Sequence, residues 1–162
     1  MDHNIRIQER ATKARGFCEN HLSYTLSEYD DFSTEARARF VNALAFALDD
    51  DEPILTIENV IDRGSKSVEF AVFTKNRVLY FKGECERDKQ PSIRVIPRRT
   101  LESLSILDSP AVIDAGRFNG HARYALTYPN GISFELNARN ARKDSYEAIT
   151  NLLTALYEDL EA

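Results

Sequence analysis

Hydrophobic positions along the chain change their spacing twice, and these changes separate helical from strand-forming parts. Between residues 36 and 48, apolar residues recur every three or four positions. After Pro53 they alternate with polar residues, and the helical spacing returns over residues 146–160. A three-to-four residue period indicates one face of a helix, whereas alternation indicates a strand with one buried face. The pattern therefore predicts helices, then a series of strands, then one long helix.

The first fifty residues predict two helices with an irregular segment between them. Residues 4–16 contain few apolar positions, so a helix there needs a packing partner to be stable. Residues 17–32 fit helix and loop equally well. The second helix is expected to begin after Ser33, a good N-cap residue, and to end near residue 50. An acidic run there opposes the helix dipole, and Pro53 disfavours helix at the residue before it.

About seven short strands are predicted after Pro53, and two turns between them are the clearest signals. Lys75 and Asn76 form a polar pair between two strand-like runs. Asn130 and Gly131 permit the positive φ angles of a tight hairpin. The strands are expected within residues 55–61, 68–72, 78–81, 93–96, 104–106, 122–128 and 132–136, and Val112–Ile113 is a candidate short strand inside a long loop at 108–120.

An apolar stripe predicts the last helix over about residues 141–160, with Asp144 and Glu147 placed as a capping box. Several short strands separated by turns favour a small sandwich or barrel. The terminal helix must bury its stripe, and an open end or an edge of the barrel is the obvious place. We therefore expect an α+β fold.

Two stretches of the chain resemble bacterial pleckstrin-homology-like (PH-like) domains. They are AVFTKNRVLYF at residues 71–81, which is similar to a strand-turn-strand hairpin of that family, and the segment 93–104, with its Ile-Pro ending at Pro97. The resemblance covers roughly residues 53–161. It implies a partly open seven-stranded β-barrel capped by the C-terminal helix, with residues 1–52 as an N-terminal helical extension and 53–162 as the PH-like domain. It also implies a binding or scaffolding module without catalysis.

Eukaryotic members of the wider superfamily bind phosphoinositides through basic residues around the first hairpin. The corresponding segment here supplies Arg63 and Lys66, but Glu69 and Ala71 stand where further basic residues would be expected. A polyphosphorylated headgroup needs several charge-assisted contacts, and a carboxylate among them repels it. Phosphoinositide binding is therefore not expected.

Composition points to a folded protein with no general attraction to nucleic acid. The chain is 43% hydrophobic and 29% charged, with a formal net charge of −5. No apolar run approaches the roughly 18 residues of a transmembrane segment. The first residues lack the apolar core of a secretory signal, and two cysteines form no disulfide scaffold. These features together predict a cytoplasmic protein.

The sequence carries no recognisable catalytic or metal-binding motif. The histidines are isolated, and no His-Glu-x-x-His or Cys-x-x-Cys pattern occurs. The common nucleotide-binding and hydrolase signatures are missing too. We expect the cysteines to be small, buried apolar residues. We therefore expect no metal, no cofactor and no enzymatic activity. The isolated residues are His3, His21 and His121, and the cysteines are Cys18 and Cys85.

A basic cluster lies within residues 82–99, where six basic residues interleave with three acidic ones. Such a cluster can recognise an acidic partner, or it can be a solvated strand edge that discourages pairing with other chains. The interleaving favours the second interpretation. The candidate contact residues for a partner are Arg63, Lys66, Arg98 and Arg99. Charge reversal at Arg98 and Arg99 is expected to weaken an acidic partner and to leave the fold intact.

Aromatic residues occupy successive or odd-spaced strand positions, so they must face opposite sides of the sheet. This holds for Tyr80 with Phe81 and for Phe70 with Phe73. One member of each pair then lies outside the barrel core. Either the N-terminal helices cover that face, or it binds a partner protein or a second copy.

Two functional hypotheses follow. The first is a module that binds a protein partner, self-association included, at an exposed strand edge or in the groove beside the C-terminal helix. The second is a small-ligand or lipid carrier that uses the barrel interior or the space under the N-terminal helices. The supply of nine Phe and seven Tyr motivates the second.

Overall fold

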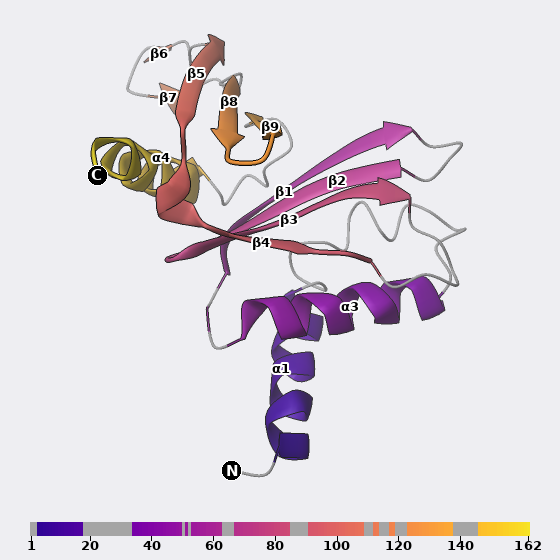
Figure 1. Ribbon diagram of the computed structural model, residues 1–162. Helices are drawn as coiled ribbons and strands as arrows, with labels where there is room; N and C mark the ends of the chain where they lie inside the picture. The colour runs from indigo at the N-terminus through magenta and orange to yellow at the C-terminus, as the bar shows by residue number, and fades with distance from the viewer. Residues whose placement is uncertain are drawn as a thin grey trace. The chain divides into compact units, whose positions relative to one another are not determined.

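The structure is a computed structural model, and the chain divides into two compact units, Met1–Val95 and Ile96–Ala162. Each unit contains an antiparallel sheet (Figure 1). The division predicted from the sequence, into a helical extension of residues 1–52 and a domain of residues 53–162, stays a prediction. The structure describes residues 3–17, 34–49, 51, 53–62, 67–84, 91–108, 112–113, 117–118, 123–137 and 146–162.

The first unit combines two helices with a four-stranded sheet in the order β1-β2-β3-β4. The predicted helices and the first four predicted strands are confirmed. The irregular segment before α3 lies outside the described residues, together with the proposed Ser33 cap. The elements are α1 (His3–Phe17), α3 (Thr34–Leu48), β1 (Pro53–Asp62), β2 (Ser67–Thr74), β3 (Arg77–Glu84) and β4 (Arg94–Pro97).

Helix α3 ends where its sequence predicts, and two acidic residues after it, Asp49 and Asp51, are held by basic partners. Asp49 adopts a left-handed conformation with φ 54°. The backbone N–H of Asp51 then donates to the Leu48 carbonyl at 2.9 Å. The Asp49 carboxylate pairs with Arg10 of α1, so the end of α3 is tied to α1.

The predicted turn at Lys75 and Asn76 is confirmed, and a buried threonine organises it. The Thr74 hydroxyl accepts the N–H of Arg77 at 2.9 Å and lies 3.1 Å from the Asp51 carboxylate. Arg77 Nε donates to the same carboxylate at 2.8 Å. The turn is thereby fastened to the chain that leaves α3.

Helix α3 packs on the first sheet through an aromatic cluster of Phe40, Phe70 and Phe81. The Phe40 ring meets Phe70 edge-on at 5.6 Å and Phe81 at 4.9 Å, and Phe70 stacks on Phe81 at 5.4 Å. Leu44 and Leu48 extend the same contact along α3, which runs beside the sheet in Figure 1. A helix of the N-terminal extension thus covers this aromatic face, as one of the two interpretations requires.

The opposite face of the first sheet is buried as well. Phe73 and Val78 are fully buried, and Tyr80 is nearly so. Because β2 and β3 bury side chains on both faces, their sequences are almost continuously apolar. The opposite orientation predicted for Tyr80 and Phe81 is therefore confirmed.

The second unit contains a three-stranded sheet in the order β5-β8-β9 and one C-terminal helix. The predicted Asn130-Gly131 hairpin is confirmed, with φ of 66° and 73° at these two residues. Strand β6 matches the candidate short strand, and it pairs with β7, which was not predicted. The elements are a 3-10 turn η2 (Arg98–Thr100), β5 (Ser103–Asp108), β6 (Val112–Ile113), β7 (Arg117–Phe118), β8 (Arg123–Tyr128), β9 (Ile132–Asn137) and α4 (Tyr146–Glu161).

The described strands form separate sheets and are not closed into the expected barrel. After β4 the chain passes through η2, and β5 then pairs with β8. The hydrogen-bonded ladder is therefore interrupted between the fourth and fifth strands. The fold is α+β with two main antiparallel sheets and a C-terminal helix, and no helix within the described ranges is long and apolar enough to cross a membrane.

We expect Phe40→Ala to destabilise the protein by about 3–5 kcal/mol, because it removes the ring at the centre of the aromatic cluster. Urea unfolding of dilute protein measures the change. Phe46→Ala is the matched control: Phe46 lies on the same helix but is exposed, so its loss should cost about 0.5 kcal/mol or less. Equal losses in the two variants would contradict the role given to the cluster.

Candidate functional site

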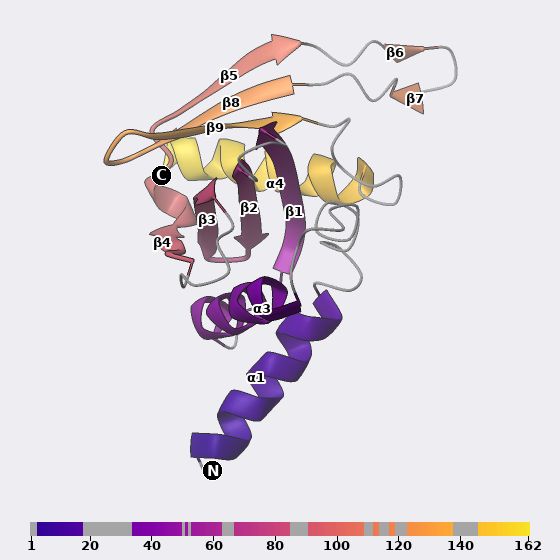
Figure 2. The ribbon, with the colours of Figure 1, turned by 90° about the vertical axis from the view of Figure 1, so that its right-hand side faces the viewer.

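Strands β5, β8 and β9 lie side by side in Figure 2, and one face of this sheet carries rows of apolar side chains that end at β5. One row passes from Leu136 through Tyr124 to Ile106, and the other from Phe134 through Leu126 to Leu104. The β8 and β9 members of both rows are buried, whereas Ile106 on β5 is 55% exposed. The apolar face therefore ends in side chains that are only partly covered.

Strand β5 forms this edge. Among the described residues it hydrogen-bonds only to β8, along one of its two sides. Natural sheet edges are commonly protected by Lys, Pro or a covering element. The six residues of β5, SLSILD, include neither Lys nor Pro. We call Ser103–Asp108 with its unpaired side the β5 edge.

Acidic residues stand at both ends of the β5 edge. Glu102 precedes the strand and is exposed, and Asp108 ends it. Asp108 accepts from Arg123 at 3.3 Å, and Arg123 also pairs with Glu135 of β9 at 2.9 Å. The hydrogen bond that Arg123 donates to Glu135 is the main reason why the pKa of Arg123 is raised. This surface network joins the three strands and keeps the local charge at the edge acidic.

A buried ion pair joins η2 to α4. Arg98 Nε donates to Asp159 Oδ2 at 2.8 Å, and Arg98 Nη2 lies 3.4 Å from Oδ1. Only 11% of the Arg98 side chain and 4% of the Asp159 side chain are exposed. The end of α4 is thereby fixed to the turn that leads into β5.

The four candidate contact residues have different surroundings. Arg63 and Lys66 lie outside the described residues. Arg99 is exposed, and Arg98 is committed to Asp159. A partner-binding role for each of them stays a prediction. One expectation needs correction: reversing the charge of Arg98 would place two carboxylates together in a buried site, so this change should disturb the fold.

Two buried tyrosines differ in their hydrogen bonds. The Tyr80 hydroxyl donates to Glu69 at 2.7 Å. The Tyr128 hydroxyl is buried and finds no partner among the described residues. Burial is the largest cause of a raised pKa in both, followed by Glu69 for Tyr80 and by the charge of Asp159 for Tyr128. Both side chains are therefore held in the neutral form.

The sequence reasoning missed Ile106 and Asp159 as the important residues of this unit. The alternation of Leu104 and Ile106 with polar residues predicts a strand, but it does not predict whether that strand lies at an exposed edge of a sheet. Asp159 did carry a signal, because it follows Leu152 and Leu156 in the buried stripe of α4. A charged residue in such a stripe indicates a buried partner of opposite charge.

Metal-binding groups are not assembled in the part of the chain that the structure describes. No three His, Cys, Asp or Glu side chains there are close enough together to hold a metal ion. His3 is exposed on α1, and the other histidines and both cysteines lie outside the described ranges.

Comparison with known proteins yields no matching family model and no matching curated protein. The resemblance to PH-like domains therefore rests on the residues of this chain alone.

Arg98→Ala should destabilise the protein by about 3–5 kcal/mol, because it leaves the Asp159 carboxylate buried without its partner. Arg99→Ala is the control and should change the free energy of unfolding by about 0.5 kcal/mol or less, since its side chain is exposed. The double variant Arg98→Met/Asp159→Leu should recover most of the loss. Chemical unfolding of the three variants checks this ordering, and a harmless Arg98→Ala would refute it.

The raised pKa values of Tyr80 and Tyr128 predict a loss of stability at high pH. Unfolded tyrosine loses its proton near pH 10, while the folded side chains keep theirs. The free energy of unfolding should therefore be steady below about pH 9 and fall as the pH rises above about 10. Tyr128→Phe should make this fall shallower.

At neutral pH the two Tyr→Phe variants should differ. Tyr80→Phe loses a hydrogen bond to a carboxylate and should cost about 1–2 kcal/mol. Tyr128→Phe removes a hydroxyl that has no described partner, so it should be neutral or stabilising. Urea titrations at neutral and alkaline pH measure both effects, and a destabilised Tyr128→Phe would show that its hydroxyl is bonded after all.

Proposed function

We propose that this protein is a non-enzymatic binding module that engages a protein partner by strand addition at the β5 edge. The single observation that carries the proposal is the exposed Ile106 at the end of an otherwise buried apolar row. A strand laid against the unpaired side of β5 would gain backbone hydrogen bonds along its length. Its apolar side chains would extend the two rows.

The rows also define the partner's sequence pattern. Leu104 and Ile106 lie two positions apart on one face, so the partner should present apolar residues at alternating positions. Glu102 and Asp108 at the ends of the edge favour basic residues flanking them. The expected partner is an extended segment with alternating apolar residues between Lys or Arg.

The order of elements supports a PH-like assignment within this proposal. The strands of the four-stranded and three-stranded sheets precede a C-terminal helix, which is the order of strands and helix that the resemblance implies, although the sheets are not closed into its barrel. The two-residue strands β6 and β7 are additions between β5 and β8. The buried ion pair of Arg98 and Asp159 keeps α4 against η2, next in sequence to β5.

The alternative function, a small-ligand or lipid carrier, receives less support. The space between α3 and the sheet holds the aromatic cluster together with Leu44 and Leu48. The notch between α1 and α3 has a volume of about 20 Å³. Sites for drug-sized ligands are roughly 300 Å³ or larger. The notch has room for about one water molecule.

Selection from a phage-displayed library of random peptides tests the proposal. Peptides with apolar residues at alternating positions and flanking basic residues should be enriched on the wild-type protein. Ile106→Lys should lower the affinity of the selected peptides about tenfold or more, because it places a charge at the end of an apolar row and blocks edge pairing.

Val95→Lys is the matched control for that experiment. Val95 is also exposed, at 46%, but it lies on β4, which belongs to the other sheet. Its replacement should leave most of the affinity. Peptides that bind Ile106→Lys as well as wild type, or selected peptides with a helical period, would rule out strand addition at this edge.

A further inference from the structure

Charge is segregated among the helices of this acidic chain. Helix α1 carries four basic residues and one acidic residue, and α3 carries two basic residues and one acidic residue. Helix α4 carries four acidic residues and no basic residue. The chain as a whole has a net charge of −5, so the positive charge of α1 and α3 stands out against the rest.

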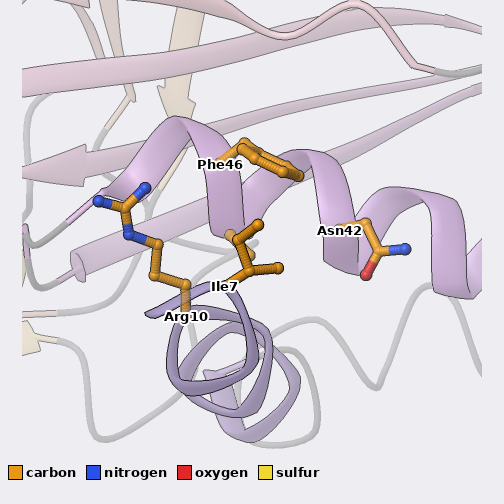
Figure 3. A pocket seen from close by; sticks show the side chains of 5 residues that line it. Ile7, Arg10, Asn42 and Phe46 are labelled. Atoms are coloured by element: carbon orange, nitrogen blue, oxygen red, sulfur yellow. The ribbon is translucent and has the colours of Figure 1, made fainter. Parts of the chain in front are cut away.

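The basic pair of helices also exposes an apolar surface, which we call the α1/α3 face. Its most prominent residue is Phe46, whose side chain is 61% exposed. Beside Phe46 lies the notch between the helices, where Ile7 and Arg10 point from α1 toward α3 (Figure 3). Asn42 completes the rim with a polar group.

Helix α4 presents the complementary combination of apolar and acidic side chains. Its inner stripe is buried, but Tyr157 is 46% exposed and Leu160 is 36% exposed. Glu158 and Glu161 flank these two residues and are exposed as well. We call these four residues the α4 outer face.

We propose that the protein associates with a second copy of itself through the α1/α3 face of one copy and the α4 outer face of the other. Tyr157 and Leu160 would pack against Phe46 and the rim of the notch beside it. Glu158 and Glu161 would lie near the basic residues of α1. Arg6 and Lys13 are exposed on α1.

A contact between the two different faces is more favourable than a symmetric contact in which each copy uses the same helix. Two α4 helices would bring acidic residues together, and two α1 helices would bring basic ones together, so both pairings are repulsive. Contact between α1 and α4 brings opposite charges together around large apolar side chains. This inference uses surfaces other than the β5 edge and does not rest on the proposed function.

Sedimentation velocity of the full chain at increasing protein concentration tests the association. The weight-average mass should rise with concentration, and high salt should weaken the association because the charges involved are exposed. Phe46→Glu and Tyr157→Arg should each lower the association constant about tenfold or more. Val95→Asp is the control, since it adds a charge to an exposed apolar position on β4, and it should leave the constant unchanged.

Mixing the two impaired variants distinguishes this arrangement from any other. Phe46→Glu keeps an intact α4 outer face, and Tyr157→Arg keeps an intact α1/α3 face. The mixture should therefore form a mixed complex at a concentration at which each variant alone stays monomeric. A symmetric contact through either helix would not be restored by mixing.

Three results would overturn the inference. They are a wild-type protein that stays monomeric at all concentrations, variants that associate like wild type, and a mixture that stays monomeric. The Ile106→Lys variant separates this inference from the proposed function. It should lose peptide binding and still self-associate, so either proposal can fail while the other stands.

Discussion

Contact between Phe40 and the rings of Phe70 and Phe81 is the constraint on which the first unit depends. The sheet formed by β1 to β4 buries apolar side chains on both faces, so a sheet alone would expose several aromatic rings to water. Helix α3 covers one of those faces, and its position is set by the edge-on packing of Phe40. Helix α1 is weakly apolar by itself and is held against α3 by the pairing of Arg10 with Asp49.

The second unit is organised by a charged group inside an apolar stripe. Asp159 occupies a buried position of α4, and its burial is tolerable only because Arg98 reaches it from η2. The ion pair fixes α4 in one register against η2, where an all-apolar stripe could slide. The apolar rows of the three-stranded sheet are buried on β8 and β9 and end at the exposed Ile106 on β5.

Several large apolar side chains in the described part of the chain stay exposed once these two contacts are made. They are Ile106 and Leu107 at the β5 edge, Phe46 beside the notch, Tyr157 and Leu160 on α4, and Ile5, Ile54 and Val95 elsewhere. An apolar centre with a polar and charged rim is typical of protein interfaces. The function that we propose, binding to other protein chains, uses surfaces of this kind.

Local spacing in the sequence determined the helices, the two tight turns and most strands. Helix and strand periods are properties of short segments, and so is the positive φ of Asn130 and Gly131. The tertiary structure decided which charged residues are buried, since the partnership of Arg98 with Asp159 spans sixty-one positions. It also decided that the ladder breaks after β4, because strand pairing is a long-range choice between competing partners. The exposure of Ile106 and Phe46 could not be predicted from the sequence either. An apolar residue in the sequence can be buried or exposed, and only the tertiary structure decides which.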